Sequence, residues 1–136
     1  MELTIAGARY IQEIQHDFND AFPFLKIEFF KPQSSRTVHA YAANLLKHSL
    51  KINEARRLQQ DGVMEIKDIT KVSDLEKDFK EKFGLYVQVF RKSGNVWLET
   101  TMSDNWTLKQ QNDHGREIST YTSKPLVSND IEDVNQ

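Results

Sequence analysis

The sequence predicts an α+β fold in which two similar β-α-β-β units share one core and pack their helices on a mainly antiparallel sheet. Three observations predict it: two amphipathic helical patterns of the same spacing, an apolar strand after each, and a hairpin pattern after the second strand. The chain has 136 residues, which suits one domain or two very small halves with a common core. We expect a first unit over residues 1–61, a second over 62–122 and a flexible tail over 123–136.

The first unit starts with apolar and polar residues alternating over residues 2–6, which is typical of a short strand. Residues 9–22 follow as an amphipathic helix, because apolar residues recur there every three or four positions. These apolar residues are Ile11, Ile14, Phe18 and Phe22. Pro23 cannot continue the helix, and the alternation over residues 24–31 predicts a strand.

The rest of the first unit carries weaker signals. Residues 37–46 mix strand-forming and helix-forming side chains, and we interpret them as a strand that turns into a loop. Ser49 suits the N-cap of a helix over residues 49–60, which would end before Asp61 and Gly62.

The second unit repeats the order of elements. Residues 63–67 form a predicted strand, and a helix follows that Gly84 would end in a left-handed conformation. The apolar stripe of this helix consists of Val72, Leu75, Phe79 and Phe83. Two strands, over residues 85–91 and 95–101, flank a predicted turn at Ser93-Gly94. A short helix over 107–112 and a last strand over 117–121 complete the unit.

The predicted hairpin separates its side chains into two faces. Counting outward from Ser93-Gly94 pairs Phe90 with Trp97 and Val89 with Leu98. One face then carries only aliphatic residues and is expected to point inward. Those residues are Leu85, Val87, Val89, Val96 and Leu98.

The two units match in sequence order. A shift of 61 residues places the apolar residues of the first strand and helix on those of the second, for example Leu3 on Met64 and Phe18 on Phe79. After the helix the shift becomes 60, so that Ile27 meets Val87. Neither unit is large enough to bury much surface alone, and we therefore expect a duplicated unit with a shared core.

The hairpin segment FGLYVQVFRKSGNVWLETT, followed by WTL at residues 106–108 and GRE at 115–117, resembles a family of small bacterial proteins of unknown function. The earlier segment FPFLKIEFF resembles the first half of the same family, whereas residues 37–60 depart from it more. The resemblance implies a compact bacterial intracellular domain. It supplies no activity, cofactor or catalytic residue.

Composition narrows the classes of function. With 38% hydrophobic and 28% charged residues, the chain has an ordinary globular composition, and its net charge of −2 creates no general attraction for nucleic acid. The absence of cysteine excludes disulfides, thiol nucleophiles and zinc–thiolate sites. Neither a signal peptide nor a membrane span is expected, so we predict a cytoplasmic protein without membrane association.

The outer face of the hairpin is the candidate binding surface. Its predicted residues are Tyr86, Phe90, Arg91, Lys92 and Trp97. Two large aromatic side chains beside two cations could bind a peptide, a second subunit or stacked bases. The alternative is that these aromatic residues are packed beneath another element of the fold.

The sequence favours a non-enzymatic interaction module that binds a protein partner or a second copy through a sheet face or edge. The alternative is a single-stranded nucleic-acid-binding domain that uses Phe90, Arg91, Lys92 and Trp97. Catalysis has less support, because no histidines stand at metal-binding spacing and no nucleophile or phosphate-binding motif occurs. No cofactor, metal ion or catalytic residue is therefore predicted.

Overall fold

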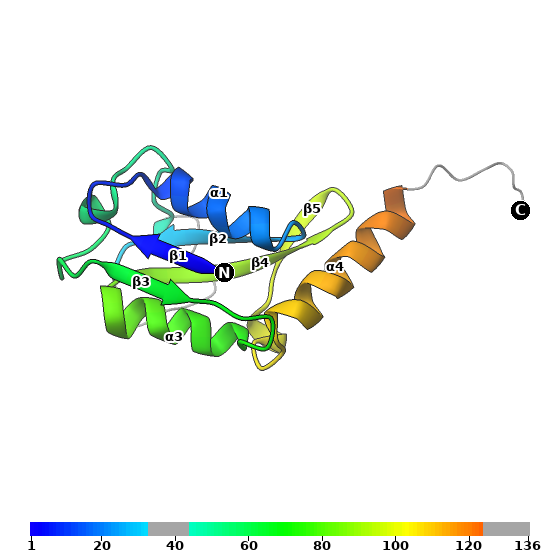
Figure 1. The fold of residues 1–136 in the computed structure, drawn as a ribbon. Coiled ribbons are helices and arrows are strands. Elements are labelled where there is room, and N and C mark those ends of the chain that lie inside the picture. Colours follow the sequence, from blue (N-terminus) through cyan, green and yellow to red (C-terminus); the bar gives the residue numbers. More distant parts are fainter. Residues whose placement is uncertain (33–43, 124–136) are drawn as a thin grey trace, which may run out of the picture.

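The computed structural model describes residues 1–32 and 44–123. Within these ranges the chain forms three α-helices and five strands in two antiparallel sheets, which confirms the predicted α+β class (Figure 1). The elements are β1 (Glu2–Ile5), α1 (Ile11–Ala21), β2 (Leu25–Phe30), the 3-10 turn η2 (Ile52–Glu54), β3 (Gly62–Glu65), α3 (Val72–Phe83), β4 (Tyr86–Ser93), β5 (Val96–Glu99), the 3-10 turn η3 (Thr101–Ser103) and α4 (Leu108–Ser123).

The strands form two separate sheets where the sequence suggested one. β1 pairs with β3, and β4 lies between β2 and β5. The two-stranded sheet lies in front of the other, with α1 along one side and α3 along the opposite side (Figure 1). Each β-α-β segment therefore crosses from one sheet to the other through its helix, and the two helices lie on opposite sides of the core.

Both helices and both sheets contribute to a single hydrophobic core. Its fully buried large side chains are Leu3, Ile5, Ile11, Ile14, Phe18, Leu25, Ile27, Phe29, Ile52, Ile66, Leu75 and Phe79. The rings of Phe29 in β2 and Phe79 in α3 meet edge to face at 5.9 Å between centroids, so the first half of the chain packs directly on the second. Neither half keeps a core of its own.

The pairing of the two halves is symmetric. Leu3 pairs with Met64, and Glu28 pairs with Gln88. These are the residues that coincide in the sequence shifts, since 3 + 61 = 64 and 28 + 60 = 88. Exchanging the two halves therefore leaves both registers unchanged, as in two segments related by an approximate two-fold axis.

Backbone hydrogen bonds at the start of each helix repeat in the same way. The Ile11 amide donates to the Leu50 carbonyl at 2.8 Å, and the Val72 amide donates to the Trp106 carbonyl at 3.0 Å. After each β-α-β segment, the chain thus returns to the N-terminus of the helix in that segment. This symmetry describes geometry and not descent, so the duplication of one ancestral unit stays a prediction, as do the boundaries at residues 61 and 62.

Two predicted elements were wrong. The helix expected over residues 49–60 is only the 3-10 turn η2, because the Arg56 side chain turns inward and binds the loop that follows. The strand expected over 117–121 belongs to α4. The predicted strand over 37–46 falls largely outside the described residues, although Leu45 forms a bridge with Phe30 at the edge of β2. The predicted tail lies outside them except for the last residue of α4.

The hairpin turn is also displaced by one residue. Ser93 pairs with Val96, so the turn is Gly94-Asn95, and Phe90 lies opposite Glu99 where Trp97 was expected. Gly94 has a φ of 65°, the left-handed conformation that the first position of such a turn requires. The partner of each residue moves by two positions, so each side chain keeps the face that was predicted.

Helix α4 docks on the hairpin mainly through polar contacts. The Phe24 amide donates to Asn112 Oδ1 at 2.8 Å, and the Gly94 amide donates to Ser119 Oγ at 3.1 Å. A Cβ atom on Gly115 would lie 3.0 Å from the Cγ of Arg91, so the helix backbone approaches β4 closely. After Leu108, which belongs to the core, polar and small residues thus occupy the buried stripe of α4.

Arg56 secures the connection between the two halves. Its side chain is 0% exposed and forms an ion pair of 2.6 Å with Asp61, and it donates to the carbonyl of Phe83 at 3.3 Å. It also donates to Asn53 Oδ1 at 2.9 Å. The guanidinium therefore joins the end of α3 to the loop that leads into β3.

We expect Arg56→Ala to lower the free energy of unfolding by about 2–4 kcal/mol, because buried acceptors lose their donor. Arg57→Ala is the matched control: Arg57 is exposed, and its loss should change stability by no more than about 0.5 kcal/mol. Urea unfolding followed by tryptophan fluorescence measures both. Equal effects of the two substitutions would contradict this role of Arg56.

Candidate interaction surface on the hairpin

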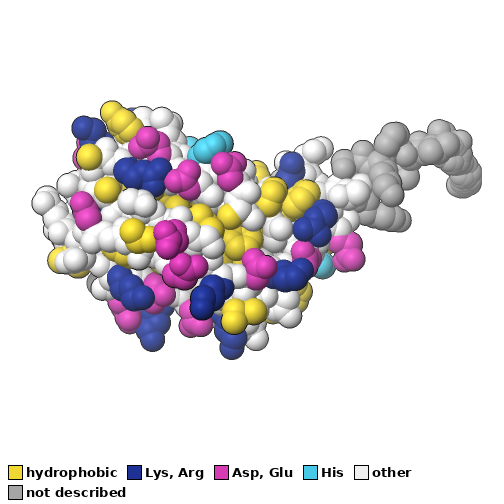
Figure 2. Space-filling model, viewed as in Figure 1, with side chains coloured by type: hydrophobic (Ala, Val, Ile, Leu, Met, Phe, Trp, Pro, Cys, Tyr) yellow, Lys and Arg dark blue, Asp and Glu magenta, His cyan; other side chains and the backbone are white. Residues whose placement is uncertain are grey.

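The structure brings most of the predicted binding residues to one face of the three-stranded sheet, the face turned away from the core. We call this the hairpin face, formed by Lys26, Tyr86, Phe90, Lys92 and Trp97. Phe90 and Trp97 are both partly exposed, so each ring is partly covered by the fold and partly accessible to solvent. On the face seen in Figure 2, hydrophobic, acidic and basic side chains are interspersed.

Lys26 bridges the two aromatic rings. Its Nζ atom lies 5.0 Å from the ring centroid of Trp97 and 5.7 Å from that of Phe90. The same atom lies 3.1 Å from a carboxylate oxygen of Glu28. A cation from β2 thus orders the aromatic side chains of β4 and β5. Tyr86, further along β4, has the Nζ atom of Lys80 at 5.7 Å from its ring.

Arg91, by contrast, lies on the opposite face of β4. Its guanidinium donates to Gln111 Oε1 of α4 at 2.8 Å, and its Nε atom is buried without a hydrogen-bond partner. Burial lowers the pKa of Arg91 from its usual value. Adjacent strand residues point to opposite faces. Arg91 therefore contacts α4, and of the two predicted cations only Lys92 lies on the hairpin face.

Sequence reasoning missed a polar cluster around Glu28. This carboxylate is almost buried and accepts from Gln15 Nε2 at 3.2 Å, while His48 Nε2 lies 2.9 Å from it. A groove of about 280 Å³ between α1 and the sheet is lined by residues that include Trp97 and His48. No sequence spacing links these residues, because they come from four separate segments.

The two edges of the three-stranded sheet differ. At the β2 edge, the side-chain amides of Gln15 and Asn19 donate to the carbonyls of Ile27 and Leu25, both at 2.8 Å. Further along, the Leu46 amide donates to the Phe29 carbonyl at 2.9 Å. Side chains of α1 and a returning segment therefore satisfy the carbonyl groups that β2 directs away from β4.

At the opposite edge, β5 offers its backbone to solvent. Ser93 and Val96 flank the turn and form the first hydrogen-bonded pair of the hairpin, and Leu98 follows the same pattern. Trp97 and Glu99 therefore direct their N–H and C=O groups away from β4. Within residues 1–32 and 44–123, no strand, bridge or backbone hydrogen bond meets this edge.

No family model, curated protein or solved structure matches this chain. The resemblance of the hairpin segment to small bacterial proteins therefore stays a prediction. None of the helices in the described part of the chain has the length and apolar character needed to cross a membrane.

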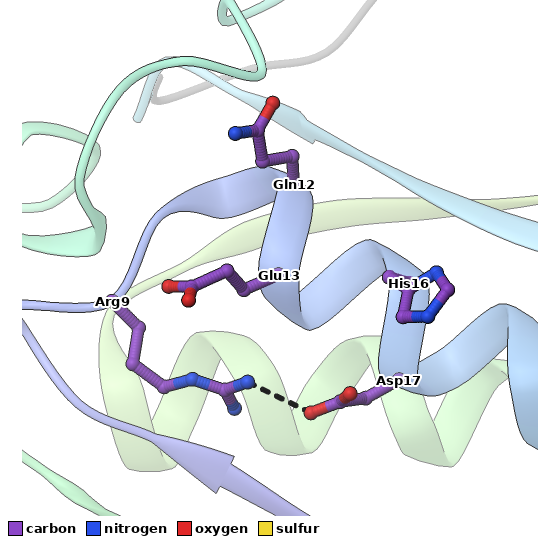
Figure 3. Close-up of a pocket in the computed structure, with 5 residues that line it drawn as sticks. All are labelled: Arg9, Gln12, Glu13, His16 and Asp17. Carbon is purple, nitrogen blue, oxygen red and sulfur yellow. Dashed lines mark hydrogen bonds and ion pairs between the residues drawn. The ribbon is translucent and has the colours of Figure 1, made fainter.

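A second hollow on the surface uses its charged groups structurally. A depression of about 350 Å³ on α1 is lined by residues that include Arg9, Glu13 and Asp17 (Figure 3). Arg9 forms an ion pair of 2.8 Å with Asp17, and the Glu13 carboxylate accepts from the Tyr10 amide at the helix start. These charges stabilise α1 and its N-terminus, so the depression presents little that could bind a charged ligand.

The three histidines among the described residues do not converge on one site. His16 lies 3.2 Å from Asp20 on the same helix, His48 contacts Glu28, and the His114 ring meets the Trp106 ring at 5.6 Å. In the part of the chain that the structure describes, no three histidine, aspartate or glutamate side chains are placed to bind a metal ion.

We expect the contact between Lys26 and Trp97 to be measurable in a double-mutant cycle. Lys26→Met, Trp97→Leu and the double variant should give a coupling of about 0.5–2 kcal/mol, because a partly desolvated cation lies over the ring. Lys82→Met with Trp97→Leu is the control, since Lys82 forms its ion pair with Asp78 on α3 and not with the hairpin. Its coupling should stay within about 0.3 kcal/mol. Equal couplings in urea unfolding would contradict the ordering role of Lys26.

Proposed function

We propose that the protein is a non-enzymatic interaction module that binds an extended segment of a protein partner beside β5. The contrast between the two sheet edges supports the proposal. The outward carbonyls of β2 accept hydrogen bonds from Gln15, Asn19 and Leu46, whereas the outward groups of Trp97 and Glu99 have no partner among the described residues. An uncovered edge binds an added strand through backbone hydrogen bonds.

The side chains of β5 suit this use. Proteins protect free edges with proline, bulges, charged side chains or short strands; Val96–Glu99 is short and ends in the charged Glu99, but it contains no proline or bulge and carries three apolar residues. Val96 is 55% exposed and Leu98 is 43% exposed, although both were expected to point into the core. They extend past the core because β5 pairs only with the end of β4. An added strand would cover Leu98 on one face and approach Trp97 on the other.

The geometry favours nucleic-acid binding less. Lys26 already lies over the rings of Phe90 and Trp97, which bases would have to stack on, and Arg91 is directed into the α4 contact. The formal charge of −2 adds no general attraction for a polyanion. Strand addition needs neither the ring faces nor Arg91.

Catalysis through the Glu28–His48 pair also has less support. The carboxylate that could orient the imidazole is shared with Lys26 and Gln15, so these contacts secure β2 against α1. No nucleophilic hydroxyl contacts His48 in the described residues. The proposal includes the cytoplasmic setting expected for a chain without cysteine.

Selection of phage-displayed extended peptides on the immobilised protein tests this proposal. Glu99→Pro removes an outward amide that an added strand would use, while Glu99→Ala removes the same side chain and keeps the amide. We expect selected peptides to bind the wild type and Glu99→Ala alike, and to bind Glu99→Pro roughly tenfold more weakly. Peptides that bind all three proteins equally, or a selection without any binding peptide, would contradict strand addition at β5.

A further inference from the structure

We propose that the partner at this edge is a second copy of the chain, with β5 pairing antiparallel to β5 of the other copy about a two-fold axis. The inference rests on the proposed strand addition and names its occupant. The three-stranded sheet of each copy would continue into that of the other, with the β2 edges at the two ends. Both outer edges are then the ones that α1 already covers.

Backbone geometry selects one register for this pairing. A two-fold axis can pass beside Trp97, Leu98 or Glu99 of the two strands. With Leu98 on the axis, Trp97 of each copy lies opposite Glu99 of the other, and all the outward N–H and C=O groups of both residues are paired. An axis at Trp97 would require Asn95, a turn residue, as the partner of Glu99.

Charge supports the same register. An axis at Glu99 would place two carboxylates directly opposite each other, which is unfavourable on a sheet. With Leu98 on the axis, each Glu99 lies beside Trp97 of the other copy, and Lys92 flanks that ring on β4. Each row across the interface then contains the cation of Lys92, the ring of Trp97, and the carboxylate of Glu99 and the ring of Phe90 from the other copy.

The pairing also covers the exposed side chain of Leu98. This residue is 43% exposed and would meet its own copy at the axis. A two-fold interface requires a patch that is complementary to itself. β5 meets this requirement, because one strand carries the aliphatic residue for the axis and both members of the aromatic–acidic pair.

Sedimentation velocity of the full chain over a wide range of concentrations gives the first test. We expect a reversible dimer in the wild type and a somewhat weaker one in Glu99→Ala, which loses the carboxylate beside Trp97. Relative to Glu99→Ala, the dissociation constant should rise roughly tenfold or more in Glu99→Pro, which also loses hydrogen bonds at two symmetric places. A chain that stays monomeric would overturn the second copy as partner. If the chain is monomeric but the selected peptides still bind Glu99→Pro more weakly than Glu99→Ala, strand addition at β5 holds and only the second copy is ruled out as the partner.

Single cysteines test the register, because the natural chain contains none. Leu98 would form a pair without mutual backbone hydrogen bonds, whose Cα atoms lie about 4.5 Å apart, within the range of about 4.4–6.8 Å that disulfides span. Oxidised Leu98→Cys should therefore form a covalent dimer quickly, and Val96→Cys and Trp97→Cys slowly. Circular dichroism checks that each variant is folded. Fastest cross-linking at residue 96 or 97, or a dimer unaffected by Glu99→Pro, would overturn the proposed pairing.

Discussion

The antiparallel pairing of β2 with β4 is the interaction on which the rest of the fold depends. It joins the two β-α-β segments at Glu28 and Gln88, and β1 and β3 join them again on the other side of the core. A single helix with one apolar stripe and two short strands cannot bury enough surface to fold alone. When the two segments pair, Phe18 and Phe79 are removed from water in the same cluster.

The same pairing decides which surface is left for a partner. One side of β2 is used by β4, and the other is filled by amides of α1. β4 pairs with β2 at residues 86–91 and with β5 at residues 90–93, so the short strand β5 is the end of the sheet in the described part of the chain. A closed core and one uncovered edge are thus two results of one arrangement. The proposed function follows from the edge, and the hairpin face beside it supplies aromatic side chains that could contribute specificity.

The position of Lys26 connects the core to that surface. It stands next to the buried β2 residues Leu25 and Ile27, yet its ammonium group reaches the ring of Trp97 on β5. The carboxylate of Glu28 holds the same ammonium group from within β2. The aromatic face is therefore ordered by the strand at which the two halves meet, and not by the hairpin alone.

Apolar periodicity predicted the parts of this fold that bury apolar side chains. The stripes of α1 and α3 and the aliphatic face of β2 and β4 were visible for that reason. Helix α4 was only partly predicted, because residues such as Gln111 and Gly115 occupy its buried stripe. The position of the hairpin turn was predicted one residue too early. Ser93, Gly94 and Asn95 are all common turn residues, so the sequence does not distinguish a turn at Ser93-Gly94 from one at Gly94-Asn95.

In the candidate site, too, only the features marked by a local sequence pattern could be predicted. The outward parity of Phe90 and Trp97 followed from alternation and survived the shift of the turn. The contacts of Glu28 with His48 and of Lys26 with Trp97 join residues that are distant in sequence and carry no local pattern. The free edge of β5 depends on which strands pair, and a single sequence does not specify that pairing.

Native-state hydrogen exchange of the full chain tests the shared core most directly. If the two halves are stable only together, the slowest amides of β2 and of β4 exchange through the same global unfolding, with free energies that agree within about 1 kcal/mol and fall in parallel as denaturant is added. If the slowest amides of one half exchange at a clearly lower free energy, that half unfolds while the other stays folded. The two segments would then have separate cores, which would contradict the account.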